Sequence, residues 1–262
     1  MARYAMALIT GASSGIGAAF ARALAAQGTD LVLVARSVDR LEALAMELRS
    51  SHGRVVHVVP ADLTSPGAAV AVKAELDARG VAVDLLINNA GFGTTGRFVD
   101  QDAQRELDEI SLNAGAVVAM SHAFLPTMLA WRHGAIMNIA STAAFQPMPY
   151  FAVYAATKAF VHSFSDALWL ECAGAGVHVM AVCPGPVDTP FFENIGTRHR
   201  LREVMPKATM ATPEAVAAKA LAGLACRQRL VIPGLTNKIG ASASRLFPRS
   251  WVTRLVGGFM QR

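Results

Sequence analysis

The chain has 262 residues, 53% of them hydrophobic and 16% charged, with a mean hydropathy of +0.37 and a formal charge of +5. This apolar balance suits a sheet that helices cover on both faces, and the dispersed basic residues argue against a nucleic-acid partner. The cysteines Cys172, Cys183 and Cys226 form no CxxC pair, which argues against a disulfide framework or a zinc site; we expect small buried hydrophobes in a reducing compartment.

The first predicted strand, Tyr4–Thr10, runs directly into a glycine-rich turn, so we expect no secretory signal. The turn reads GxxxGxG, with Gly11, Gly15 and Gly17 between this strand and a predicted helix, Gly15–Gln27. Such glycines let the backbone approach a pyrophosphate at the helix N-terminus. A structural turn without a ligand is the alternative interpretation of this motif.

The second predicted strand, Asp30–Ala35, ends where an NAD site would place an acidic residue. Arg36 stands there instead, and a guanidinium can pair with the 2′-phosphate of NADP. Ser13 and Ser14 could donate to the same phosphate. A solvated surface arginine is the alternative, but the position of Arg36 favours NADP(H) over NAD(H).

Apolar runs and Ala-rich stretches alternate along the rest of the chain, which predicts a doubly wound α/β fold. We expect a seven-stranded, mainly parallel sheet with helices on both faces, in one domain over residues 1–262. The further predicted strands are Arg54–Pro60, Val83–Asn88, Gly134–Ala140, Val177–Cys183 and Arg229–Ile232. The further predicted helices are Arg40–Ser50, Ala68–Arg79, Gln104–Trp131, Phe151–Ala173 and Pro213–Cys226.

The stretch Ser111–Trp131 contains no Asp, Glu, Lys or Arg and approaches the length of a membrane span. It includes Asn113, His122 and Pro126, and its ends lack flanking anchors. A buried core or interface helix is therefore the better interpretation.

Two segments interrupt the alternation. Residues 185–212 are too long for a simple loop and are a candidate substrate lid. The tail 234–262 sets apolar residues among arginines; one stripe has helical spacing: Trp251, Val252, Leu255, Val256, Phe259 and Met260. We expect this helix to pack on its own domain or on a second subunit, with peripheral membrane contact as the alternative.

Tyr154 and Lys158 lie four residues apart on a predicted helix, so their side chains share one face. A nearby ammonium favours the phenolate, so we expect Lys158 to lower the pKa of Tyr154 toward the working range. Ser141 follows the fifth strand, where its hydroxyl could stabilise a developing oxyanion. Singly, such a pair is common on amphipathic helices, and such a serine is often a cap.

In combination, these residues make the sequence resemble the short-chain dehydrogenase/reductase family over nearly its whole length. The matching motifs are TGxxxGxG at Thr10–Gly17, Asp62-Leu63, the NNAG of residues 88–91, and the PG motif from Pro184 to Thr189. Four further residues match the family's catalytic tetrad in order and spacing: Asn113, Ser141, Tyr154 and Lys158.

The resemblance implies a Rossmann fold and hydride transfer between a nicotinamide cofactor and a carbonyl or alcohol. It implies that Tyr154 is the acid/base, that Lys158 also binds the nicotinamide ribose and that Asn113 holds a water. The implied cofactor-binding residues are Gly11, Ser13, Ser14, Gly15, Ile16, Gly17, Arg36, Asp62, Leu63, Asn89, Ala90, Gly91, Tyr154, Lys158, Pro184, Gly185, Val187 and Thr189. It also suggests a homodimer or homotetramer built on Gln104–Trp131 and Phe151–Ala173, and we expect a cytoplasmic protein without a metal site.

The predicted substrate pocket is hydrophobic, which favours a ketone, an aldehyde or an acyl chain. Its expected lining is Phe92, Phe145, Met148, Tyr150, Phe151, Phe191 and Phe192.

Three rivals remain: an NADP-binding sensor without chemistry, a membrane-docking protein that uses the basic tail, and an epimerase or dehydratase of related fold. A degenerate sensor would be expected to lose the Tyr, Lys or Ser, which are all present here. The NNAG stretch argues against the epimerase, because epimerases resemble a GxxGxxG pattern and lack NNAG.

Overall fold

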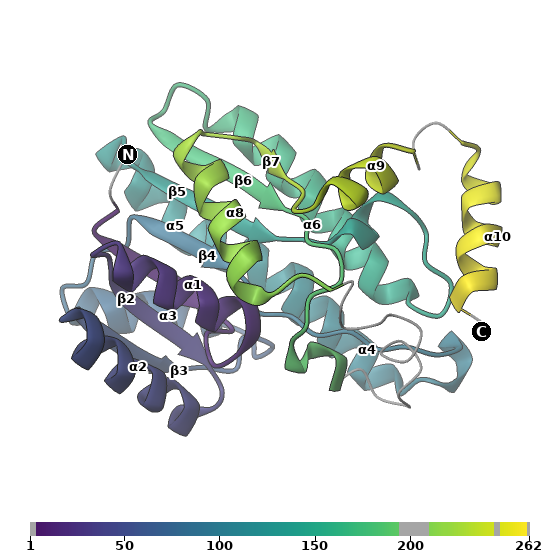
Figure 1. Cartoon of the computed structure of the whole chain (residues 1–262). Coiled ribbons are helices and arrows are strands. Elements are labelled where there is room, and N and C mark those ends of the chain that lie inside the picture. Colours follow the sequence, from purple (N-terminus) through teal and green to yellow (C-terminus); the bar gives the residue numbers. More distant parts are fainter. Residues whose placement is uncertain (1–3, 194–209, 244–246, 261–262) are drawn as a thin grey trace.

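Seven parallel strands form one sheet in a computed structural model that describes residues 4–193, 210–243 and 247–260 (Figure 1). The order across the sheet is β3-β2-β1-β4-β5-β6-β7, and every neighbouring pair is parallel. The strands are β1 Met6–Thr10, β2 Asp30–Ala35, β3 Val56–Pro60, β4 Leu85–Asn88, β5 Gly134–Ile139, β6 Val177–Val182 and β7 Leu230–Val231. The predicted doubly wound sheet is confirmed, and it is parallel throughout.

Helices connect the strands within a few residues of the predicted bounds. They are α1 Gly15–Ala26, α2 Val38–His52, α3 Ala68–Ala78, α4 Ala103–Ile110, α5 Ala116–Trp131, α6 Ala152–Glu171, α8 Pro213–Ala225, α9 Leu235–Ala243 and α10 Arg249–Met260. Several strands begin two residues later than predicted, because the apolar run in the sequence starts before ladder pairing does.

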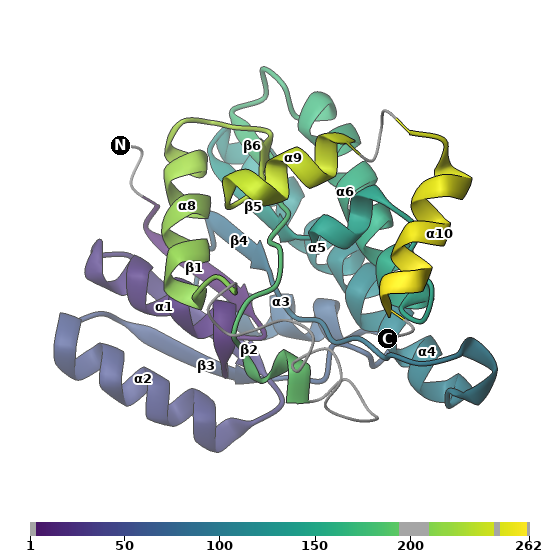
Figure 2. The ribbon, with the colours of Figure 1, turned by 45° about the vertical axis from the view of Figure 1, so that its right-hand side comes forward.

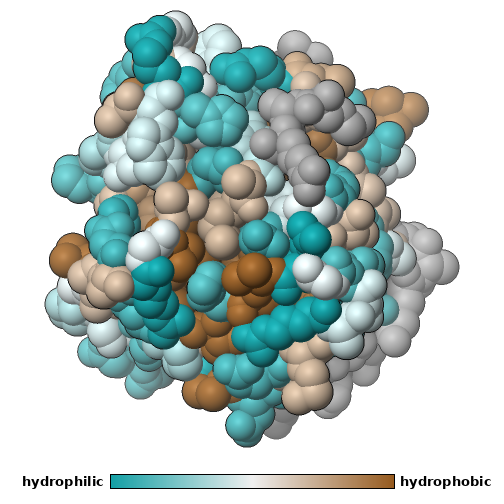
Figure 3. Space-filling view, turned by 90° about the vertical axis from the view of Figure 1, so that its left-hand side faces the viewer, coloured by the Kyte–Doolittle hydropathy of each residue, from teal (hydrophilic) through white to brown (hydrophobic). Residues whose placement is uncertain are grey.

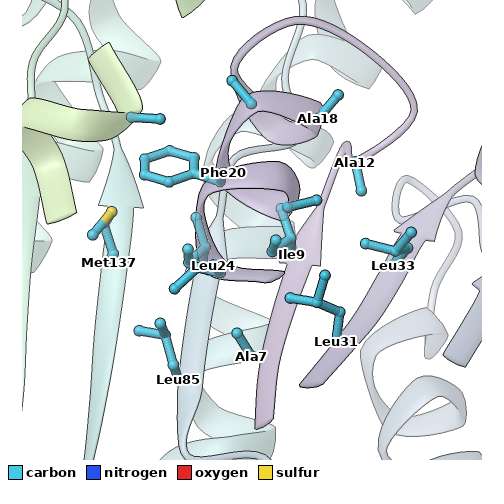
Figure 4. Close-up of a cluster of buried hydrophobic side chains, with 14 of the residues drawn as sticks. Ala7, Ile9, Ala12, Ala18, Phe20, Leu24, Leu31, Leu33, Leu85 and Met137 are labelled. Atoms are coloured by element: carbon cyan, nitrogen blue, oxygen red, sulfur yellow. The ribbon is translucent and has the colours of Figure 1, made fainter. Parts of the chain in front are cut away.

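Two separate hydrophobic layers hold the helices against the sheet. On one face, α1, α2 and α8 pack on side chains of the central strands; Figure 4 shows Phe20 and Leu24 of α1 over this layer. On the other face, α3 and α5 cover the opposite side chains of the same strands. Because both faces are covered, β1, β4, β5 and β6 are almost wholly buried apolar runs, as a parallel sheet requires.

The strand order reverses beside β1, which pairs with β2 on one side and with β4 on the other. The connections from these strands run to opposite faces of the sheet, so a crevice opens at their carboxyl ends. Open α/β sheets bind ligands at such a switch point. The fold therefore places the glycine-rich turn after β1 at this crevice.

One long helix, Ala103–Trp131, contains the charge-free stretch noted in the sequence. It joins α4 and α5 through a π-helical turn, Ser111–Gly115, and its length and composition alone would allow it to cross a membrane. In α5, however, Val117, Met120 and Phe124 are buried against the sheet layer. This helix therefore packs as a core helix, which agrees with the prediction.

The tail forms two helices, and α10 lies beside the segment that precedes α6 in both Figure 1 and Figure 2. The predicted single apolar stripe of α10 is divided between two sides. Val256 and Met260 are partly buried, whereas Trp251 is 65% and Leu255 78% exposed. The helix therefore contacts its own domain through part of the stripe, and packing of the rest on a second subunit stays a prediction.

The lid expected at 185–212 falls mostly outside the described residues. Its described ends are joined by a bridge between Val187 and Ala211 and include a 3₁₀ turn, Pro190–Glu193.

All three cysteines are free thiols, and two of them are buried as predicted. Cys226 is exposed, so the prediction is wrong there, because it follows the last turn of α8 at the surface. On the side of the molecule shown in Figure 3, hydrophobic residues gather near the centre, with hydrophilic residues around them.

Candidate active site

The glycine-rich turn is a cradle that only glycine can form. Gly11 has a φ of +65°, and a Cβ on it would lie 2.8 Å from the Cα of Ala90. A Cβ on Gly17 would lie 2.3 Å from the carbonyl oxygen of Gly11, which side-chain motion cannot relieve. The close packing of this turn therefore leaves its backbone exposed to a ligand at the start of α1.

Hydrogen bonds to the end of β4 hold the cradle in place. The Thr10 hydroxyl oxygen accepts from the backbone N–H groups of Asn89 and Ala90, at 2.9 and 3.0 Å. In return, the Asn89 amide donates to the carbonyl of Thr10 at 2.9 Å. The NNAG segment thus fixes the floor of the crevice between β1 and β4.

The end of the crevice beside β2 and α2 is basic. Arg36 follows β2, and Arg40 lies on the first turn of α2; both residues line the same cavity. Asp62, after β3, accepts hydrogen bonds from Thr64 that lower the pKa of its carboxyl, and Arg36 adds to this effect. An anionic group with several acceptors fits this end.

A cavity of about 1240 Å³ runs from these arginines past the cradle to the amino end of α6. The predicted cofactor residues that line it are Gly11, Ser13, Ser14, Gly15, Ile16, Arg36, Asp62, Leu63, Asn89, Ala90, Gly91, Tyr154, Lys158, Pro184, Gly185, Val187 and Thr189. Gly17 does not line the cavity, because it faces Gly11 and Asn89 in the packing of the turn.

The π-helical turn between α4 and α5 directs Asn113 away from the cavity, into the protein. Its amide oxygen accepts from the N–H of Phe92 at 3.1 Å, and its amide nitrogen donates to the Phe92 carbonyl and to the Thr157 hydroxyl. Both N–H groups of the amide are therefore used within the protein. Asn113 fixes the loop after β4 against α6, and such π-turns are frequent at functional sites.

Tyr154 lies at the inner end of the cavity, 9% exposed, with its ring stacked on Phe151 at 4.3 Å between centroids. Burial raises the pKa of its phenol to about 12, and a hydrogen bond with the Ser141 side chain opposes that rise. Ser141 also caps the 3₁₀ turn Thr142–Phe145 by accepting from the Ala143 N–H at 3.1 Å. The serine, at the end of β5, is thus held beside the phenol.

Lys158 lies one turn further along α6 and is 5% exposed. Its ammonium donates to the carbonyl of Ile139 at 2.9 Å and lies 5.6 Å from the centroid of the Tyr154 ring. Burial lowers the pKa of Lys158 to about 8, and the charge of Glu109 opposes this shift. The expectation that the pKa of Tyr154 lies near the working range is wrong for this structure, because burial outweighs the effects that would lower it.

A family model described as short chain dehydrogenase matches residues 5–200, which span the cradle, the NNAG segment, Tyr154 and Lys158. The chain belongs to the short-chain dehydrogenase family.

Three members of this family illustrate the similarity. A putative ketoacyl reductase of granaticin polyketide synthase from Streptomyces violaceoruber is 40% identical over 192 residues, 72% of this chain and 70% of that protein. A short-chain dehydrogenase from Sphingobium yanoikuyae, solved with NADPH, is 38% identical with a TM-score of 0.82 over 91% of each chain. A family member from Burkholderia phymatum, solved with NAD, is 27% identical with a TM-score of 0.82 over 92% of each chain.

The pocket walls differ in part from those predicted for this dehydrogenase. Phe92, Met148, Phe151 and Phe191 line the cavity as expected. Phe145 and Tyr150 do not line it. Phe145 turns away to contact the ring of His162 at 5.0 Å between centroids.

Tyr150 has a φ of +66° at the turn before α6. The side chain of Phe192 lies outside the described part of the structure.

Sequence reasoning missed three parts of the cavity. Two of them are Arg40 at the start of α2, which no spacing signal indicated because Arg36 lies before the helix, and Arg105 with Asp108 on α4. The other part is α10, whose side chains can reach the cavity only through tertiary packing; the lining residues here are Arg254, Leu255, Val256, Gly258 and Met260. Met260 packs against the cluster that contains Phe151 and Tyr154.

Proposed function

We propose that this dehydrogenase is NADP(H)-dependent and interconverts a hydrophobic ketone, aldehyde or acyl-type carbonyl with the corresponding alcohol. One observation carries the proposal: a single cavity joins the Arg36–Arg40 end to Ser141, Tyr154 and Lys158. The basic end fits a phosphate, and the other end offers a proton donor among apolar walls. The alternative is an NADP-binding sensor of the same fold.

The residues present fit a dinucleotide. The cradle has room for a ligand only because Gly11 and Gly17 carry no Cβ. The glycine-rich turn would hold the pyrophosphate, Arg36 and Arg40 the 2′-phosphate, and Lys158 the nicotinamide ribose. When bound, the cofactor supplies or accepts a hydride at the carbonyl carbon of the substrate.

The chain's own residues would handle the proton. The Tyr154 phenol, held protonated by burial, donates its proton to the carbonyl oxygen in reduction and accepts it back in oxidation. The Ser141 hydroxyl donates a hydrogen bond to the same oxygen as negative charge develops. The Lys158 ammonium, fixed by the Ile139 carbonyl, stabilises the phenolate that remains.

The substrate class follows from the walls near Tyr154. Phe92, Phe151 and Phe191 lie there, and Met260 closes the cluster from α10. Such walls favour apolar carbonyl compounds over sugars or charged acids. The similarity to a putative ketoacyl reductase supports an acyl-type carbonyl among the candidates.

The cofactor is tested by fluorescence titration of the purified protein with NADPH and with NADH. We expect wild type to bind NADPH at least tenfold more tightly, since a lost bidentate arginine–phosphate contact costs about 1.5–3 kcal/mol. Arg36→Ala and Arg40→Ala should each reduce that preference. Arg97→Ala, an exposed arginine that does not line the cavity, is the matched control and should leave it unchanged.

Equal affinity for NADH in wild type, unaffected by Arg36→Ala, would refute NADP(H) selectivity. Tight NADPH binding without turnover of any carbonyl in a broad screen would favour the sensor.

We infer further that the protein is a cytoplasmic homodimer or homotetramer without a nucleic-acid partner. The oligomer is supported by exposed apolar side chains on the outer faces of α5 and α6. These are Trp131, Phe160 and Leu170. A second copy of the same helix pair would cover them.

A further inference from the structure

The outer sides of α9 and α10 carry large apolar side chains that the fold leaves exposed. On α9, Leu235 is 74% and Ile239 is 61% exposed. On α10, Trp251 and Leu255 are exposed to a similar extent. Both helices lie outside the sheet and toward the viewer in Figure 2. Exposed apolar side chains that gather on neighbouring elements mark a surface that contacts another body.

The same sequence pattern produces both apolar pairs. Residues 235–239 read LTNKI and residues 251–255 read WVTRL, so each stretch has an apolar residue, a cation three positions later and a second apolar residue. Residues three and four apart share one face of a helix, so Lys238 lies beside the apolar pair of α9 and Arg254 beside that of α10. Both basic residues are exposed. We call these six residues the α9–α10 surface: Leu235, Lys238, Ile239, Trp251, Arg254 and Leu255.

The segment that carries this surface holds the net charge of the chain. Residues 234–262 contain five Lys and Arg and no Asp or Glu. The whole chain has 24 Lys and Arg against 19 Asp and Glu, so residues 1–233 hold 19 of each sign. Cations and exposed apolar side chains on one helix face suit an anionic lipid surface, because the cations approach the headgroups while the apolar side chains enter the acyl boundary.

A second copy of this chain fits the α9–α10 surface less well. In a twofold-symmetric contact both copies present the same patch, so Lys238 and Arg254 of each copy would enter one interface. Because residues 234–262 contain no acidic side chain, no carboxylate of these helices could pair with those cations. Like charges brought together in an interface repel each other, whereas an anionic bilayer supplies the opposite charge.

The α9–α10 surface also borders the cavity. Arg254 and Leu255 are exposed, and both line the cavity. Val256 and Met260, on the other side of α10, line the same cavity. The cavity therefore reaches the outside of the molecule beside α10.

We propose that the α9–α10 surface docks the protein on an anionic lipid bilayer. Trp251 and the three aliphatic side chains enter the interface, where tryptophan is enriched in membrane proteins, and the two cations contact the headgroups. Docking brings the opening of the cavity beside α10 to the lipid, into which an apolar carbonyl compound partitions. Only this last consequence rests on the proposed function.

The test is flotation of the purified full chain with two kinds of vesicle, phosphatidylcholine alone and phosphatidylcholine with about one-third phosphatidylglycerol. We expect the protein to bind the anionic vesicles at least tenfold more tightly, because each cation near an anionic surface contributes about fivefold in affinity. Raising the ionic strength should weaken this binding, since salt screens exposed charges.

A pair of double variants tests the apolar part of the surface. Trp251→Ala combined with Ile239→Ala removes one large side chain from each helix and should weaken binding to anionic vesicles at least tenfold. Met46→Ala combined with Val70→Ala, at similarly exposed positions on α2 and α3, is the matched control and should bind as wild type does. Because all four side chains are exposed, we expect both proteins to fold, and thermal unfolding verifies it.

A pair of single variants tests the charge. Lys238→Gln removes a cation of the α9–α10 surface and should weaken binding to anionic vesicles about fivefold. Lys219→Gln removes the same charge from an exposed position on α8 and should leave binding unchanged.

Three results would overturn the proposal: no binding of wild type to anionic vesicles, equal binding to neutral vesicles, or binding that the Trp251→Ala, Ile239→Ala double variant retains in full. Light scattering coupled to size exclusion, without vesicles, tests the second copy as occupant. A lower mass for that double variant than for wild type would show that the surface joins two copies and would overturn membrane docking. None of these measurements uses a carbonyl substrate, so a failure of docking and a failure of the proposed function are distinguishable.

Discussion

At the residue scale, burial rather than pairwise attraction controls the ionisation of the active site. Tyr154 and Lys158 lie close together, yet each is shifted toward its neutral form, the phenol to a pKa of about 12 and the amine to about 8. The sequence shows the spacing of the pair but not how deeply α6 packs behind the cavity. Spacing therefore predicted which residues meet, whereas the sign of the phenol's pKa shift needed the structure.

The buried Glu109 makes the stability of the fold depend on pH. Its pKa rises from 4.5 in the unfolded chain to about 7, so between these values the unfolded state releases a proton that the folded state keeps. The contribution of Glu109 to the free energy of unfolding therefore falls as pH rises from 4.5 to 7, by on the order of 3 kcal/mol.

Glu109→Gln should lack this fall, so we expect its stability relative to wild type to increase over this pH range. Urea denaturation at several pH values measures the difference. A difference that stays constant with pH would contradict the burial of an ionisable Glu109.

At the element scale, the strands and helices that carry the cofactor cradle could be predicted from sequence. Their apolar runs and the glycine spacing after β1 are local signals, whereas the strand order that places the switch point between β1 and β4 needed the structure. The π-turn at Asn113 could not be predicted, because its cause is tertiary: Asn113 bonds the backbone of Phe92. The contribution of α10 to the cavity lining was missed for the same reason, since the residues that it contacts lie far away in sequence.

The inward side of α10 should set substrate affinity. Met260→Ala should raise KM for a bulky hydrophobic carbonyl by about fivefold, because a partly buried methionine contact is worth about 1 kcal/mol. Its kcat should change little, since Met260 does not reach the reacting atoms in the proposed mechanism.

Trp251→Ala is the matched control on the outward side of α10, where the side chain does not line the cavity. Steady-state kinetics of both variants measure the contrast. Equal KM values for Met260→Ala and wild type would contradict the prediction that α10 contacts the substrate.

At the scale of the whole molecule, two helical layers cover both faces of the sheet and leave the outer faces of α5 and α6 partly apolar. Phe160 on α6 is 45% exposed and stacks on Phe164 with centroids 6.0 Å apart. An aromatic pair of this kind at a surface is typical of a site that a partner covers.

Phe160→Glu should therefore shift the proposed homo-oligomer toward the monomer, because the new charge would be buried without a counterion. Phe98→Glu, at an exposed phenylalanine elsewhere on the surface, should leave the assembly unchanged. Light scattering coupled to size exclusion measures both masses. A wild-type protein that is monomeric throughout would contradict the proposed assembly.

The most direct test of the central claim is the rate of NADPH oxidation with a hydrophobic carbonyl in wild type, Tyr154→Phe and Tyr150→Phe. We predict that Tyr154→Phe lowers kcat by about a thousandfold, because it removes the proton donor. Tyr150→Phe should stay near wild type, since Tyr150 does not line the cavity. Turnover by Tyr154→Phe within a few-fold of wild type would show that another group donates the proton and would contradict the account.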